Sequence, residues 1–218
     1  MNETLDRQRR IQERDRRGSR TREALKQAAL TLLRGDKRFA DISLREVTRE
    51  VGIVPTAFYR HFVDMEELGL ALLDEAMQTL RALLREARLE RGSPRSVVAR
   101  TIRALVHALA QQPLYFRFIV REYHGGSGRL GEAVRGEIRR FTTELAIELA
   151  RFPHLQAWNA EDLQMLAALI IKVMASAAER MLDAPTRLED GRGGDIGRIA
   201  EKQLRLIVLG TQHWHSEG

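Results

Sequence analysis

Cysteine is missing from all 218 residues, and proline occurs only five times. Without cysteine the chain has no disulfide, no zinc finger and no thiol nucleophile, which suits a reducing compartment. Long apolar runs are missing too, since the stretch LAALIIKVMA contains Lys172 and is too short to span a bilayer. The first residues, MNETLDRQRR, are charged and do not resemble a secretory signal. We expect a cytoplasmic protein with no membrane partner.

Sequence signatures of enzymes are equally scarce. The chain has no nucleophile elbow, no phosphate-binding loop and no cluster with metal-ligand spacing. His213 and His215 have a spacing that suits a metal ion, but two such residues at a chain terminus are more often incidental. We therefore expect no enzymatic activity, no metal site and no cofactor.

Positive charge is concentrated in the first part of the chain. Residues 1–62 contain 15 Lys and Arg against 9 Asp and Glu, whereas residues 63–218 contain 21 of each kind. The whole net charge of +6 therefore lies in the first 62 residues. A basic segment joined to a neutral body is typical of a protein that binds a polyanion. A solvated basic surface gives the same pattern, so charge alone leaves both interpretations open.

Apolar residues recur with a helical period along almost the whole chain. Residues 1–19 are the exception, because they are polar without an apolar stripe, and we expect a flexible basic arm there. Helix-capping signals, such as the capping box that begins at Ser43, mark several boundaries. Nine helices are predicted after the arm, at about 20–34, 44–51, 55–62, 65–91, 94–112, 114–123, 132–152, 160–182 and 196–214. The predicted fold class is all-α.

The second and third of these helices are short and are separated by a turn that contains Gly52. Two short helices around a glycine turn within about 20 residues have the layout of a helix-turn-helix motif. On a helical wheel the third helix carries apolar residues on one face: Val54, Phe58 and Phe62. Its opposite face carries a hydroxyl, a phenol and a guanidinium: Thr56, Tyr59 and Arg60. We expect the first face to be buried and the second to contact DNA.

Side chains around this motif have the donors that bond phosphates and base edges. The candidate DNA-binding residues are Arg20, Ser43, Arg45, Pro55, Thr56, Tyr59, Arg60 and His61, and Thr48 is a further candidate for a phosphate contact. Tyr59 and His61 also suit a packing role, with their polar tips reaching solvent. In the arm, Arg14, Arg16 and Arg17 either follow phosphates or the minor groove, or belong to a solvated tail.

The stretch SLREVTREVGIVPTAFYRHFVDMEELGLALLDE resembles the N-terminal motif of TetR-family transcriptional regulators. The resemblance covers Arg22 to Leu73, and it implies a three-helix DNA-binding domain followed by a six-helix ligand-binding and dimerisation domain. It places the arm at 1–19 and the two domains at 20–63 and 64–218. Val54, Thr56 and Met65 depart from the family pattern, which commonly has Ser, Gly and Lys at these positions.

Within the family, GIVPTAFYRHF and the Leu-Gly-Leu after Glu67 look most like repressors of unsaturated fatty acid synthesis and acyl desaturation. The resemblance implies a repressor that binds a palindromic operator as a homodimer and senses a hydrophobic effector such as long-chain acyl-CoA. A repressor of efflux or catabolic genes that senses another hydrophobic compound is the alternative, and a helical adaptor is a third interpretation that the charge asymmetry disfavours.

Candidate residues for the effector site are Phe116, Arg117, Arg121, Phe141, Met165, Leu169 and Met174. Their apolar members suit an acyl chain, although such stripes are usually core. The arginines, together with Arg129, suit coenzyme A phosphates, or they pair with Glu122 and its neighbours on a solvated face. Candidate residues for the dimer interface, on the last two helices, are Ala175, Ala178, Leu182, Leu206, Ile207 and Trp214.

Overall fold

A computed structural model describes residues 2–34, 37–88, 94–126, 128–183 and 194–216. Over these ranges the chain is helical, with nine α-helices and two short 3-10 turns, so the prediction of an all-α fold is confirmed. The α-helices are α1 (Asn2–Leu32), α2 (Leu44–Val51), α3 (Pro55–Phe58), α4 (Met65–Arg88), α5 (Pro94–Gln111), α6 (Pro113–Gly125), α7 (Gly128–Leu149), α8 (Ala160–Asp183) and α9 (Gly194–Gly210), and the 3-10 turns are η1 (Phe39–Asp41) and η2 (Pro153–Leu155).

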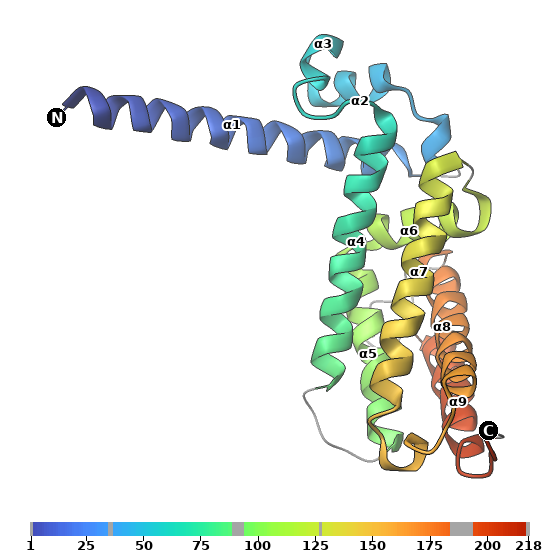
Figure 1. The fold of residues 1–218 in the computed structure, drawn as a ribbon. Helices are drawn as coiled ribbons and strands as arrows, with labels where there is room; N and C mark the ends of the chain where they lie inside the picture. Colours follow the sequence, from blue (N-terminus) through green and yellow to red (C-terminus); the bar gives the residue numbers. More distant parts are fainter. Residues whose placement is uncertain (1, 35–36, 89–93, 127, 184–193, 217–218) are drawn as a thin grey trace.

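Figure 1 shows α2 and α3 above one end of a body that is formed by α4–α9. Ser43 caps α2 as predicted, because its side chain accepts a hydrogen bond from the Glu46 amide while the Glu46 carboxylate accepts one from Ser43 N–H at 2.9 Å. Gly52 ends α2 with a left-handed backbone at φ 75°, a conformation that favours glycine. Pro55 begins α3, where its missing N–H leaves no helical hydrogen bond unmade.

Helix α1 differs from the prediction of a flexible arm. It runs as one helix from Asn2 to Leu32, roughly 46 Å at 1.5 Å per residue, and its first half leaves the body on the side opposite α8 and α9 (Figure 1). The first 17 residues contain neither glycine nor proline and are rich in Arg, Gln and Glu, which favour helix. Three acidic residues, Glu3, Asp6 and Glu13, precede an arginine by four positions, a spacing that stabilises isolated helices.

The body begins with α4, which runs beside α7 for much of its length (Figure 1). One apolar cluster extends from α1–α3 through the first half of α4 to α6 and α7, so the three-helix unit and the body share core residues. A second cluster joins α5, α6, α8 and α9. Gly69 of α4 lies where a side chain has no room, because a β-carbon there would come within 2.9 Å of Phe39 and 2.8 Å of Leu130.

Several predicted helix ends differ by a few residues. Helix α7 begins at Gly128, four residues earlier than predicted, and α9 ends at Gly210 rather than near Trp214. Helix α3 is a single α-helical turn, and the hydrogen-bonded turn that follows it extends to Phe62, where N–H donates to Phe58 C=O at 3.1 Å. The predicted end of α4 near residue 91 and most of the loop before α9 lie outside the described residues.

Candidate nucleic-acid interface and effector site

The outward surface of α3 is formed by exposed side chains on a buried base. Phe58 and Phe62 are fully buried, with their ring centroids 5.7 Å apart. The side chains that point to solvent are those of Val54, Pro55, Thr56, Tyr59 and Arg60. The Tyr59 ring lies edge-on against Phe58 at 5.8 Å, so the aromatic core holds the exposed ring in place. Four candidate DNA-binding residues (Pro55, Thr56, Tyr59 and Arg60) therefore lie on one accessible surface.

The prediction that Val54 packs with Phe58 and Phe62 is wrong. Val54 is 65% exposed. It is the N-cap residue of α3 and has extended backbone angles, φ −73° and ψ 146°. The wheel of α3 does not apply to a residue that precedes the helix, so the side chain leaves the buried face.

Helix α2 contributes a second part of this surface. Ser43, Arg45 and Arg49 are exposed, although the Ser43 hydroxyl already donates to the Glu46 carboxylate at 2.8 Å. Thr48, expected to reach a phosphate, is instead buried at 1% exposure. Its hydroxyl donates to the Leu44 carbonyl at 3.0 Å, which is how a helical threonine satisfies its O–H within its own helix. Arg49 is a cation of this surface that sequence reasoning did not single out.

His61 and Arg22 connect α3 to α1. The Arg22 guanidinium donates to the His61 carbonyl and lies 4.0 Å from the centre of the Phe62 ring. Burial lowers the pKa of His61, and the neighbouring positive charges of Arg22 and Arg60 lower it further. The imidazole is half-buried, so His61 lies at the edge of the surface. No sequence signal connects Arg22 with a residue 39 positions later.

Exposed cations continue from this surface onto α1. Arg20 and Arg16 are exposed on α1. The side chains of Arg14 and Arg17 lie outside the described residues. Arg20, Arg45, Arg49 and Arg60 therefore place accessible guanidinium groups on all three helices, an arrangement that suits the phosphates of a duplex.

Three helices meet at a polar cluster between the three-helix unit and the body. Lys26 of α1 is 6% exposed and forms ion pairs with Glu23, at 2.6 Å, and with Glu75 of α4. The Tyr115 hydroxyl of α6 donates to the Glu75 carboxylate at 2.5 Å. Burial raises the pKa of Tyr115, and the Glu23 charge raises it further, so the phenol keeps its proton at neutral pH. This cluster, which sequence reasoning missed, joins α1, α4 and α6.

Helix α6 makes a second attachment to the three-helix unit. One Arg121 nitrogen donates to the Leu33 carbonyl at 2.8 Å and to the Lys37 carbonyl at 2.9 Å, at the end of α1. The Glu122 carboxylate is 4% exposed and accepts a hydrogen bond from Phe39 N–H at 3.2 Å. Burial raises the pKa of Glu122 above its ordinary value. Arg121 thus binds backbone carbonyls, where the sequence suggested phosphates or carboxylates.

A groove of about 1040 Å³ lies between α1, α4 and the junction of α5 with α6. Polar side chains dominate its wall, and they include Glu23, Glu75 and Tyr115 of the cluster above. Arg117 is the one predicted effector residue in this wall, and its guanidinium donates to the Leu182 carbonyl at 2.6 Å. The groove therefore borders the cluster that joins the three-helix unit to the body.

The other predicted effector residues are not brought together. Phe116 is buried in the cluster of α5, α6, α8 and α9, and Met174 packs against it, whereas Phe141 belongs to the cluster around α4. Met165 and Leu169 of α8 are 39% and 42% exposed, so their side chains do not face the buried core of the body. Helix α8 is apolar on more than one side, and the sequence alone did not show which side is covered.

Some of the predicted dimer residues are buried within the chain, and others are exposed. Ala178 and Leu182 are buried in the chain's own core at 5% and 3% exposure, so they are not available to a partner. Ala175 and Ile207 are half-buried. Leu206 at 73% and Trp214 at 48% are exposed as an interface requires. The unpaired apolar surface of α8 and α9 is formed by Met165, Leu169, Leu206 and Leu209.

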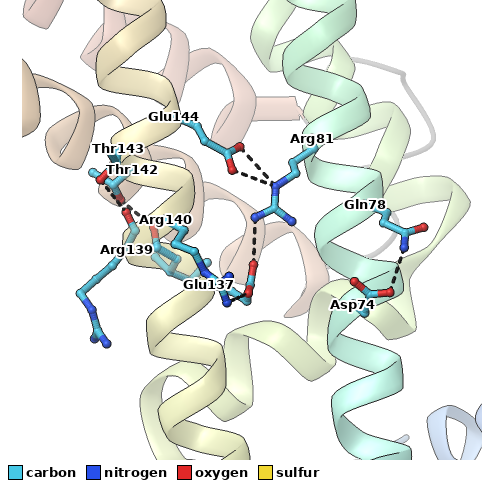
Figure 2. Close-up of polar contacts among 10 residues, drawn as sticks. Asp74, Gln78, Arg81, Glu137, Arg139, Arg140, Thr142, Thr143 and Glu144 are labelled. Atoms are coloured by element: carbon cyan, nitrogen blue, oxygen red, sulfur yellow. Dashed lines mark hydrogen bonds and ion pairs between the residues drawn. The ribbon is translucent and has the colours of Figure 1, made fainter.

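An ion cluster ties α4 to α7 lower in the body. Figure 2 shows Arg81 of α4 reaching toward two carboxylates of α7, which are 2.9 Å away at Glu137 and 3.1 Å away at Glu144. These contacts raise the pKa of Arg81, with the Glu137 hydrogen bond as the largest cause. Arg140 pairs with the same Glu137 carboxylate. The two arginine charges and the two glutamate charges of this cluster neutralise each other, so the cluster serves to hold α4 against α7.

Comparisons with known proteins bear on this arrangement. No protein-family model matches the chain. Among solved structures, the fatty acid degradation regulator FadR from Bacillus halodurans superposes with a TM-score of 0.67 at 10% identity, over 87% of this chain and 95% of that one. A TetR-like transcriptional regulator from Rhodococcus sp. RHA1 gives 0.62 at 16% identity, over 86% and 95%.

The chain has the TetR fold. A third structure with this fold is FadR from Thermus thermophilus, a TetR-family transcriptional repressor in complex with lauroyl-CoA, with a TM-score of 0.57 and 19% identity over 90% of this chain and 97% of that one. The TetR-fold neighbours are transcriptional regulators rather than enzymes. In the described ranges no helix has the length and apolarity to cross a membrane, and no group of three or more metal-ligating side chains comes together.

Proposed function

We propose that this chain is a ligand-responsive transcriptional repressor that binds DNA through residues 20–63 and binds its effector and a second copy through residues 64–218. The observation that carries the proposal is the exposed surface of α3, with Thr56, Tyr59 and Arg60 next to the Gly52 turn in a TetR fold. Hydroxyl, phenol and guanidinium groups are able to bind phosphates and base edges. The exposed guanidinium groups of α1 and α2 add affinity for the backbone.

A second copy is needed because two recognition helices must reach half-sites that lie roughly 34–36 Å apart on a palindromic operator. The exposed apolar residues of the neighbouring helices α8 and α9 support an interface there, since exposed apolar side chains that gather on one face often mark an interaction site. In this proposal Met165, Leu169 and Leu206 pack against the partner. Figure 1 shows these helices far from α1, which leaves the recognition surface free.

The proposed effector is a long-chain acyl-CoA, and the proposed target genes are those of fatty acid synthesis or desaturation. The lauroyl-CoA complex of the Thermus thermophilus protein supports this effector class, and the motif around GIVPTAFYRHF supports the subgroup. Phe116 belongs to the buried cluster of α5, α6, α8 and α9, and Met174 packs against the same cluster, whose apolar character suits an acyl chain. A repressor of efflux or catabolic genes with another hydrophobic effector is the alternative, because these features are not specific to acyl chains.

Helix α6 is the proposed connection between effector and DNA. Its apolar residues pack in the body, while Tyr115 binds α4, Arg121 binds the end of α1 and Glu122 binds η1. A ligand that shifts α6 would therefore shift the three-helix unit, provided that it binds the two arrangements with different affinity.

The proposal is tested with the full-length protein and duplex DNA that contains the region upstream of its own gene. Fluorescence anisotropy over a series of salt concentrations should show a sequence-specific complex that weakens as salt rises. Arg60→Ala should reduce affinity by about 10-fold or more, in the range expected for a base or phosphate contact. The matched control is Arg139→Ala, since Arg139 is equally exposed but lies on α7, far from α3.

Native mass spectrometry against acyl-CoAs of different chain length tests the effector, with unrelated apolar compounds as controls. Binding to the acyl-CoAs that also changes the DNA affinity would support the leading proposal. Binding of another apolar compound with the same consequence would support the alternative. A protein that forms no sequence-specific complex with its upstream or related promoter DNA would refute both.

A further inference from the structure

The recognition surface of α3 has an unusual chemistry for reading bases. From Val54 to Arg60 its exposed side chains are apolar, hydroxyl-bearing or cationic, and the segment contains no Asn, Gln, Asp or Glu. Amide side chains usually read adenine, and carboxylates usually accept from cytosine. Without these groups the surface retains an arginine that suits guanine, a threonine hydroxyl that bonds to more than one base, and apolar side chains that suit the methyl group of thymine.

Val54 is the apolar side chain best placed for such a contact. At 65% exposure it contributes little to the core, and it precedes the first turn of α3, the end of a recognition helix that contacts bases. Its direction is restricted in two ways, because Pro55 keeps the preceding residue extended and a β-branched side chain has few rotamers. The side chain is therefore held outward before DNA arrives.

The neighbours of Val54 extend the apolar character of this surface. Pro55 and the methyl group of Thr56 follow it directly, and the Tyr59 ring, 62% exposed, lies one turn further along α3. A single exposed valine needs no explanation, but an exposed valine within the recognition surface excludes water from whatever it touches. The C5-methyl of thymine is the apolar group that the major groove presents.

We propose that Val54 is a specificity-determining residue that reads the C5-methyl group of a thymine in each operator half-site. The inference rests on the proposed DNA-binding function. It assigns base discrimination to a position that the helical wheel placed in the core. Thr56 and Arg60 supply hydrogen bonds to neighbouring bases or phosphates, while Val54 distinguishes thymine by shape and apolarity alone.

The test begins with a preferred operator, which the full-length protein selects from a library of randomised duplexes. Each thymine of that operator is then replaced, one at a time, by deoxyuridine, which removes the methyl group and keeps every hydrogen-bonding group. At one thymine per half-site, deoxyuridine should weaken binding of the unaltered protein by about 4-fold, the effect of losing one buried methyl-sized group. At that same position Val54→Ala should bind thymine and deoxyuridine duplexes equally well.

Two further variants control the comparison. Val63→Ala removes another exposed valine, 75% exposed beyond α3, and should remain as sensitive to deoxyuridine as the unaltered protein. Val54→Thr keeps the branched shape if Val54→Ala proves poorly folded, which thermal unfolding shows, and it should lose part of the thymine preference.

The possible outcomes are separable. A library that yields no preferred sequence refutes both the proposed function and this inference. A preferred sequence whose thymines all tolerate deoxyuridine, or a Val54→Ala protein that stays fully sensitive at every position, overturns the inference and leaves the DNA-binding function standing.

Discussion

Replacing Tyr115 by phenylalanine should destabilise the connection between α1, α4 and α6. The substitution removes one hydroxyl and keeps the half-buried ring in place. Its O–H donates to the ionised Glu75 carboxylate at 2.5 Å, and Glu75 also holds Lys26 of α1. Because burial and Glu23 raise the pKa of Tyr115, the hydroxyl stays protonated and donates throughout the neutral range. The loss should therefore be visible at pH 7.

The size of the effect follows from the surroundings of the bond. A hydrogen bond to a charged group contributes about 1.5–3 kcal/mol. The Glu75 side chain is 34% exposed and retains its ion pair with Lys26, so water and the lysine compensate part of the loss. The lower end, about 1.5 kcal/mol, is expected, which corresponds to a fall in Tm of roughly 3–6 °C for a chain of this size.

The assay is urea unfolding followed by far-ultraviolet circular dichroism, with all proteins at one protomer concentration. Tyr123→Phe is the matched control, since it makes the same chemical change on the same helix at an exposed position. The midpoint should fall for Tyr115→Phe with an unchanged slope, and it should stay constant for Tyr123→Phe. Free energies of unfolding that agree within about 0.3 kcal/mol for the two variants would refute the reasoning that the α1–α4–α6 cluster stabilises the fold.

Three more predictions concern the body. Arg81→Gln leaves the Glu144 carboxylate without its cation and should cost about 2 kcal/mol in urea unfolding, whereas Arg139→Gln on exposed α7 surface should change stability by less than about 0.5 kcal/mol. Leu206→Glu should convert dimers into monomers in size-exclusion chromatography with light scattering, and Gln203→Glu on the same helix should not. If each of the two variants remains dimeric, an α9 interface is disproved. Burial raises the folded-state pKa of Glu122, so its carboxyl stabilises the fold below the ordinary value of 4.5 and this stabilisation is lost as pH rises through the folded pKa. The Tm of Glu122→Gln should therefore rise relative to that of the unaltered protein as pH rises from 4 to 8, and a difference in Tm that is constant with pH would contradict this.

Local signals in the sequence were sufficient for most of the secondary structure. The capping box at Ser43 and the end of α2 at Gly52 are determined by neighbouring residues, and both predictions are confirmed. The prediction of a flexible arm before residue 20 rests on the absence of an apolar stripe, whereas α1 is helical from Asn2. Arginine, glutamine and glutamate favour helix without burying a face, and that propensity decides the outcome where no core is available.

The errors in the candidate site have a common physical origin. A helical wheel of α3 predicts burial for Val54, but the backbone of Val54 is extended and its side chain is exposed. On α8, apolar residues lie on several sides, and only the packing of other helices shows that Leu182 is covered while Leu169 is not. The contact of Lys26 with Glu75 joins residues 49 positions apart, a distance at which one sequence carries no pairing information.

The contacts of Arg121 and Glu122 limit how freely the N-terminal unit of such a protein can be exchanged. A hybrid joined at residue 63 would receive a foreign segment in place of residues 37–42, and these two side chains would then face carbonyl and amide groups in altered positions. A buried carboxylate without its donor is costly. A three-helix unit that is combined with a different body, in evolution or in the laboratory, would therefore have to be transferred together with the matching part of α6. The exchangeable unit would be larger than residues 20–63, and its boundary would be discontinuous in the sequence.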